Sequence, residues 1–123
     1  MFKLKKLFII IFLFITTIIP QEKLSFSALS MQGKTINGQK VEIFKKNVQV
    51  TYKGMILYSD IATHYKEKQK VILDNGVKMI DGNDSLICDQ LIIFNDKNER
   101  YNAIGNVEFY QKDRKLSCNN FIY

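Results

Sequence analysis

One short pattern occurs three times in this chain, about thirty residues apart. A valine opens each copy, at Val48, Val77 and Val107. A polar residue follows twelve positions later, at Asp60, Asp89 and Asn119. Regular spacing of this kind is the sequence signature of a repeat architecture, in which each copy is one small structural unit packed against the next. The repeat therefore limits the fold more than any other feature of the chain.

Within each copy the apolar residues recur every second position. The segments 48–51, 77–79 and 107–109 alternate apolar and polar side chains, which is typical of a β-strand with one buried face. The residue before each valine is one that tolerates a positive φ, as tight turns require: Asn47, Gly76 and Asn106. Turn-forming residues then interrupt each copy at 53–54, 81–84 and 112–114, and a second apolar strand follows. The sequence predicts an all-β fold with two or three strands per copy.

Asp60, Asp89 and Asn119 occupy equivalent positions in the three copies, and we call them the polar column. At this column the alternation of inward and outward positions changes phase. Beyond it, the positions that match best between copies are Ala62, Leu91 and Phe121, which requires a bulge or bend near the preceding polar residue. We expect the strand to turn a corner there. A catalytic or metal-binding role for Asp60 and Asp89 is disfavoured, because they lie a whole repeat apart and the third copy has Asn119. No catalytic residue, metal ligand or cofactor site is predicted, and we expect no enzymatic activity.

The first residues form a separate segment. Lys3, Lys5 and Lys6 precede an apolar run over residues 7–19, which is shorter than the ~20 residues of a comfortable transmembrane helix. We interpret residues 1–27 as a signal peptide, or alternatively as an uncleaved anchor, and residues 28–123 as the exported domain. The net charge of +6 includes these three lysines, so the remainder carries about +3. That charge is far from the strongly basic character of a nucleic-acid binder.

The repeat carries a resemblance to a known family. The segments "NVQVTYKGMILYSDIATHY" and "GVKMIDGNDSLICDQLIIF" combine Asn or Gly with Val, then an apolar residue, Ser or Cys and Asp, then an aromatic ending. They resemble the repeat of the OstA-like family, the periplasmic lipopolysaccharide-transport proteins of LptA type and their domain relatives. The resemblance covers residues 38–123 and rests on three copies in register behind an export signal.

The resemblance implies a fold, a location and a task. It implies a repeat-built, slot-like antiparallel β-jellyroll in the periplasm, whose apolar interior shields lipopolysaccharide acyl chains on their way to the outer membrane. The implied partners are lipopolysaccharide and other transport proteins, or a second copy joined through exposed edge strands. Contact with a membrane is expected only through an uncleaved leader. The side chains that we predict to line the slot are Val48, Val50, Leu57, Val77, Met79, Leu86, Cys88, Val107, Phe109, Leu116 and Cys118.

Two alternatives stay open at this point. The same side chains could fill an ordinary closed core, as in a structural or adhesive exported β-repeat protein. The chain could also be a membrane-anchored relative of LptC type, or the N-terminal domain of an outer-membrane translocon. Because the sequence stops inside the third copy, we expect it to be a piece of a longer protein.

The cysteines and the histidine are ambiguous. Cys88 and Cys118 occupy one column, so a disulfide is possible if their strands are neighbours, whereas Ser59 fills that column in the first copy and favours small buried side chains instead. There is no C-x-x-C motif, and His64 is the single histidine, so zinc binding is disfavoured. We expect His64, near a strand end, to lie on the surface.

Overall fold

The protein is described here by a computed structural model over residues 24–122, in which ten strands form one antiparallel sheet. The predicted leader and its alternative as an anchor helix lie largely outside these residues. No helix that is long and apolar enough to cross a membrane occurs among them. The strands are β1 (Ser25–Ser27), β2 (Ser30–Ile36), β3 (Gln39–Tyr52), β4 (Met55–Tyr65), β5 (Lys70–Asp74), β6 (Val77–Asp81), β7 (Asp84–Cys88), β8 (Gln90–Phe94), β9 (Arg100–Gln111) and β10 (Arg114–Ile122).

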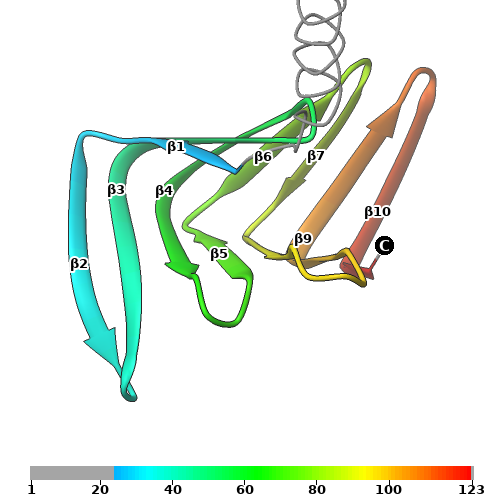
Figure 1. The fold of residues 1–123 in the computed structure, drawn as a ribbon. Coiled ribbons are helices and arrows are strands. Elements are labelled where there is room, and N and C mark those ends of the chain that lie inside the picture. The colour runs from blue at the N-terminus through cyan, green and yellow to red at the C-terminus, as the bar shows by residue number, and fades with distance from the viewer. Residues whose placement is uncertain (1–23, 123) are drawn as a thin grey trace, which may run out of the picture.

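The sheet is folded lengthwise into two arms. The long strands β3, β4, β9 and β10 run through both arms, and the consecutive strands β5–β6 and β7–β8 do the same with a short interruption. Arm A contains β2, β5, β8 and the adjoining halves of the long strands. Arm B contains β1, β6, β7 and the other halves. Figure 1 shows the two arms diverging from their common bend.

The bend runs through the columns that the sequence singled out. The pairing register of β3 with β4 shifts between Lys45 and Val48, and that of β10 with β9 shifts between Cys118 and Asn120. Two consecutive residues with positive φ mark the corner in each copy: Lys46–Asn47, Asn75–Gly76 and Gly105–Asn106. The predicted change of phase at the polar column is thereby confirmed, and so is the repeat of strand, turn and bent strand.

Turn chemistry at the free ends of the arms also follows the sequence. Asn37–Gly38 and Lys53–Gly54 have positive φ at both residues, as two-residue hairpin loops require. The predicted breaks at 53–54, 81–84 and 112–114 all lie between strands or at their ends in arm B. The expected all-β, antiparallel, slot-like architecture is confirmed for the described residues.

The core lies between the arms. Apart from Val41, the buried apolar side chains form one continuous cluster drawn from β3 to β9, with partly buried residues packed against it. Complete burial of a Val or Leu side chain contributes about 1.5–3 kcal/mol. The predicted boundary at residue 27 falls at the end of β1, whose Phe26 packs against this core. The division into leader and domain stays a prediction.

Candidate functional site

The predicted slot residues form two rows on the inner face of arm B. One row is continuous through direct strand pairing, from Phe26 on β1 through Val50, Leu57, Met79, Leu86, Phe109 and Leu116 on β10. The second row lies beside the bend and contains Val48, Ser59, Val77, Cys88, Val107 and Cys118. All eleven predicted residues thus belong to one wall of the interior.

The opposite wall was not predicted as part of the site. A matching row crosses the inner face of arm A and contains Met31, Phe44, Ala62, Leu73, Leu91, Ala103 and Phe121. The signal was present in the sequence, because Ala62, Leu91 and Phe121 form the column that follows the change of phase. These three residues belong to the same site because the two halves of each bent strand line one interior, which the structure shows and the periodicity alone does not.

Most of the interior is filled by its own side chains. Val50, Leu57, Leu86, Leu73 and Leu91 have no exposed surface, and they belong to the same cluster. The middle of the interior is therefore a packed core, in agreement with the closed alternative that the sequence left open. Within the interior, space for a ligand is left where this packing ends.

The packing ends at β10. Phe109 and Phe121 come from opposite arms and meet at a centroid separation of 5.7 Å, but neither is fully buried. Leu116, the last member of the arm B row, is 48% exposed. A cavity of about 470 Å³ lies here, lined by Phe109, Gln111, Arg114, Lys115, Leu116 and Phe121. We call this cavity the β10 mouth.

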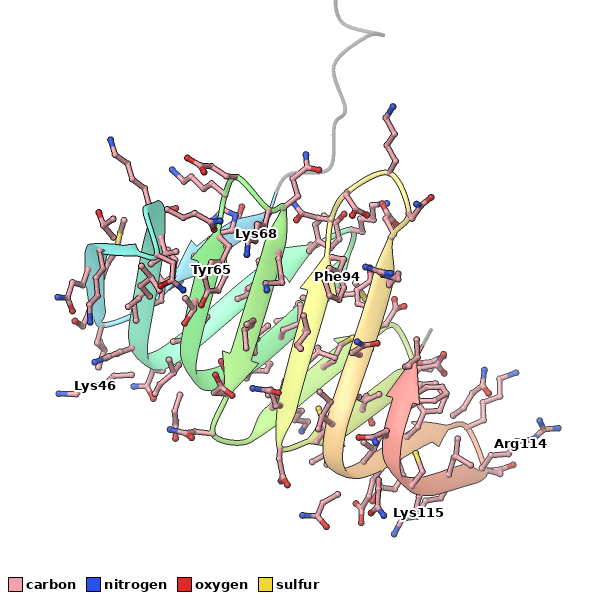
Figure 2. All side chains as sticks on the ribbon, turned by 90° about the horizontal axis from the view of Figure 1, so that it is seen from below. Lys46, Tyr65, Lys68, Phe94, Arg114 and Lys115 are labelled. Atoms are coloured by element: carbon pink, nitrogen blue, oxygen red, sulfur yellow. The ribbon has the colours of Figure 1, made fainter. Side chains whose placement is uncertain are left out.

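Charged groups surround the β10 mouth. Arg114 and Lys115 lie at the far end of the sheet (Figure 2). Lys115 Nζ lies 3.6 Å from Glu108 Oε1, and Tyr110 donates a hydrogen bond to the other carboxylate oxygen at 2.7 Å. The Tyr110 hydrogen bond, assisted by Lys115, lowers the pKa of Glu108. Because Glu108 balances the charge of Lys115, the mouth combines an apolar floor with a rim whose uncompensated cation is Arg114.

An aromatic plug fills the interior near β1. Phe26 stacks on Phe44 with ring centroids 4.4 Å apart and planes 3° apart, and the His64 ring lies 5.0 Å from Phe26. The expectation that His64 lies on the surface is wrong: its side chain is 14% exposed and faces inward. The bend after Asp60 reverses which residues of β4 point inward, so strand position alone misplaced it.

The protonation of His64 follows from this environment. Burial lowers the pKa of His64, and Lys66 adds to that effect, whereas the Glu42 carboxylate 3.2 Å from Nδ1 opposes it. Glu42 Oε1 also lies 3.3 Å from Lys66 Nζ. These contacts make His64 part of the closed end of the interior.

The cysteines are free, and the strand order explains why. Val107 on β9 pairs with Cys118, and β9 separates β7, which carries Cys88, from β10. The condition for a disulfide, that the two strands are neighbours, is not met. Cys88 Sγ donates a hydrogen bond to the Gln90 carbonyl at 3.3 Å, as Ser59 Oγ does to Ile61 at 3.0 Å. Burial raises the pKa of Cys88 to about 11.

The polar column lies on the outside of the bend. Asp60, Asp89 and Asn119 are all exposed. Asp89 accepts a hydrogen bond from Asn106 Nδ2 at 3.0 Å, and its backbone N–H donates to the Gly105 carbonyl at 2.9 Å. Asp89 therefore stabilises the bend through these two hydrogen bonds. Over residues 24–122, no cluster of three or more His, Cys, Asp or Glu residues could hold a metal ion.

The sequence matches no family model and no curated protein. The structure is similar to the crystal structure of LptH from Pseudomonas aeruginosa, described as the LptA-homologous periplasmic component of the conserved lipopolysaccharide transport device. The TM-score is 0.70 over 83% of this chain and 76% of that chain, at 15% sequence identity. The chain has an LptA-like fold. At this identity the similarity shows a shared architecture, and the residues of the interior have to support any function on their own.

Proposed function

We propose that the protein is a non-enzymatic periplasmic component of lipopolysaccharide transport, which shields acyl chains at the β10 mouth. The observation that carries the proposal is the unfinished packing at this end of an otherwise filled apolar interior. Two continuous rows of apolar side chains end there at Leu116 and Phe121, next to Arg114. An acyl chain would extend these rows, and its burial at ~25 cal/mol per Å² would supply the affinity without a polar anchor.

The cationic rim supports an anionic amphiphile over a neutral one. Arg114 lines the mouth and forms no ion pair among the described residues, so its guanidinium is available for a phosphate of the lipid headgroup. Arginine suits this contact because its planar fork binds phosphate with two parallel hydrogen bonds. The similarity to LptH in fold supports the same cargo and the periplasmic location.

The edges of the sheet support joining to a partner or a second copy. β10 pairs only with β9, and β1 and β2 pair only with β3, so each edge offers a row of unpaired backbone groups. Placing β10 of one copy beside β1 and β2 of another would continue both inner rows, from Leu116 to Phe26 and from Phe121 to Met31. A bridge of this kind would extend the apolar path beyond one molecule.

Binding of lipopolysaccharide by the Leu116→Glu variant tests the cargo. A carboxylate at the mouth would be desolvated by an acyl chain, so we expect affinity to fall at least tenfold. Leu29→Glu is the matched control, since Leu29 is 72% exposed and lies at the opposite edge. Equal affinity of both variants and the unmodified protein would contradict the mouth as the binding site.

The second candidate, a structural or adhesive β-repeat protein, is favoured by the filled middle of the interior. It predicts that neither lipopolysaccharide nor a fluorescent fatty acid binds at all. The membrane-anchored alternative is tested separately, by the mass of the N-terminal peptide of the exported protein: retention of residues 1–27 would favour the anchored relative.

A further inference from the structure

The outer face of arm A carries an unusual number of apolar side chains. In an antiparallel sheet with one buried face, the outer face is normally polar. Here the outward positions of two neighbouring rows hold six isoleucines on six strands, interspersed with polar residues such as Thr63, Asn102 and Gln90. These residues, which we call the isoleucine face, are Ile43, Ile61, Ile72, Ile92, Ile104 and Ile122.

The isoleucine face is accessible. Ile104 is 37% exposed and Ile122 is 68% exposed, while the others are half-buried beside one another. Each lies on the opposite side of its strand from a core residue, such as Leu73 next to Ile72 and Leu91 next to Ile92. None of the six therefore belongs to the interior or to the β10 mouth.

A row of cations and aromatic rings borders this face at the turn end of arm A. The strand pairing aligns Lys34, Val41, Tyr65, Lys70, Phe94 and Arg100. Lys70 Nζ lies 4.9 Å from the centre of the Tyr65 ring, and the Arg100 guanidinium carbon lies 4.3 Å from that of Phe94. Figure 2 shows Tyr65 and Phe94 at the same end of their strands, with Lys46 at the opposite end.

The charges on this face are almost all positive. Among the described residues, Lys34, Lys70 and Arg100 form no ion pair, and Lys45 adds a cation near the bend. The acidic residue in these rows is Asp74, which accepts a hydrogen bond from Gln90 at 2.7 Å. Apolar side chains flanked by cations and aromatic rings match an interface between hydrocarbon and anionic headgroups.

The outer face of arm B provides an internal comparison. One outward row of arm B consists of Gln49, Tyr58, Lys78, Ile87, Glu108 and Ser117, and the other consists of Thr51, Ile56, Ile80, Ser85, Tyr110 and Lys115. Polar and charged residues of both signs predominate there, as expected for a face in contact with water. The outer face of arm A thus holds six isoleucines, whereas that of arm B holds three, Ile56, Ile80 and Ile87.

Charge decides between the possible occupants of the isoleucine face. A second copy stacked on it would bring Lys34, Lys70 and Arg100 against a face that offers only Asp74 as a counter-charge. An anionic bilayer satisfies the cations and the apolar rows together, because headgroup phosphates lie just above the hydrocarbon. The bordering aromatic rings would lie at the depth where tyrosine side chains collect in membrane proteins.

We propose that the isoleucine face docks the protein onto the surface of an anionic phospholipid bilayer, with its strands in the plane of the membrane. This contact is separate from the leader and from the β10 mouth, and it does not depend on the proposed cargo. It would keep arm A on the membrane while the mouth stays open at the end of the sheet.

A tryptophan introduced on each face tests the docking, because the chain contains no tryptophan of its own. The Ile92→Trp variant places the probe on the isoleucine face, and Tyr58→Trp places it on arm B as the matched control. The full exported protein is mixed with vesicles of phosphatidylglycerol and phosphatidylcholine in equal parts. We expect a blue shift and quenching by brominated lipid for Ile92→Trp and neither change for Tyr58→Trp. Equal responses would show attachment through the leader alone and would overturn the proposal.

Removing the cations tests the charge argument. We expect vesicle affinity to fall about fivefold for Lys70→Gln, and again for Arg100→Gln, because each cation near an anionic surface contributes about that factor. Lys78→Gln on arm B should have no effect. Circular dichroism verifies that the variants are folded. Equal binding to pure phosphatidylcholine vesicles, or a dimer in solution that the arm A variants abolish, would contradict a membrane as the occupant.

The two proposals fail separately. Leu116→Glu should leave the Ile92→Trp response to vesicles unchanged, and Lys70→Gln should leave lipopolysaccharide binding at the mouth unchanged. If either substitution weakened both lipopolysaccharide binding and the vesicle response, the mouth and the isoleucine face would be one lipid site.

Discussion

At the scale of single residues, the fold depends on the corner where the arms meet. At this corner Asp89, the residue between β7 and β8, lies beside Gly105 on β9, and the Asp89 N–H donates to the Gly105 carbonyl. Gly105 has a φ of +83°, and a Cβ there would come within 2.5 Å of the Asp89 carboxylate. Both the backbone conformation and the approach of Asp89 therefore require glycine. Gly105 directly precedes Asn106, the third residue that the sequence singled out for its turn propensity, which also has a positive φ.

The Gly105→Ala substitution should lower the free energy of unfolding by about 2–3 kcal/mol. The positive φ alone costs about 1–2 kcal/mol for a residue with a Cβ, and displacement of Asp89 adds to it. Gly54→Ala is the control, because Gly54 has a φ of +76° but no atom within 4 Å of the added Cβ. Urea unfolding measures both. Equal losses would contradict a steric role for Asp89.

The burial of His64 makes stability dependent on pH. Burial lowers the pKa of His64 below its ordinary value of 6.5, so the unfolded chain binds a proton more readily than the folded one. This contribution is fully present above pH 6.5 and is lost as the pH falls through the unfolded pKa toward the folded one. We expect the free energy of unfolding to decrease between pH 7.5 and about 5.5, and to decrease less in His64→Gln. The same slope in both proteins would contradict this assignment.

At the scale of elements, the order of the strands controls the chemistry of the cysteines. β9 lies between β7 and β10, so Cys88 and Cys118 cannot pair without a change of sheet order. With a pKa of about 11, roughly one Cys88 thiol in a thousand is ionised at pH 8. Cys118 is only half-buried, on an edge strand.

Alkylation should therefore distinguish the two cysteines. At pH 8 we expect iodoacetamide to label Cys118 in the folded protein and to spare Cys88, and to label both after unfolding in urea. Peptide mass spectrometry identifies the modified residue. A Cys88–Cys118 disulfide in the exported protein, or equal labelling rates in the folded state, would show that the strand order is different.

At the scale of the whole molecule, the interior is a core in the middle and an open site at β10. Leu86 and Leu116 belong to the same row and differ in position along it, since Leu86 is fully buried and Leu116 is not. Leu86→Ala should lower the free energy of unfolding by about 2–5 kcal/mol, as a cavity forms in the core. Leu116→Ala should lower it by less than about 1 kcal/mol. Similar losses would mean that the mouth is packed like the middle.

Much of this architecture could be predicted from the sequence. The columns at Val48, Val77 and Val107 recur because each copy repeats one bent hairpin, so the strands, turns and inner wall of arm B could be read from periodicity. The column of the second wall, Ala62, Leu91 and Phe121, was also visible, but its place in the same interior and the orientation of His64 depend on how the bend folds the two arms together. The exposure of Leu116 also could not be predicted, since it depends on which strand ends the sheet. For the same reason, alternation along the sequence did not show that the six isoleucines share the outer face of arm A.

Photo-crosslinking from position 109 tests the central claim most directly. A photoreactive side chain at Phe109, at the β10 mouth, should label lipopolysaccharide in cells, whereas the same group at Glu108, the outward neighbour on β9, should not. Position 79, in the filled middle, should crosslink mainly to the protein's own core. Labelling of lipopolysaccharide from 108 and 109 alike, or from neither, would contradict a lipid-binding interior that opens at β10.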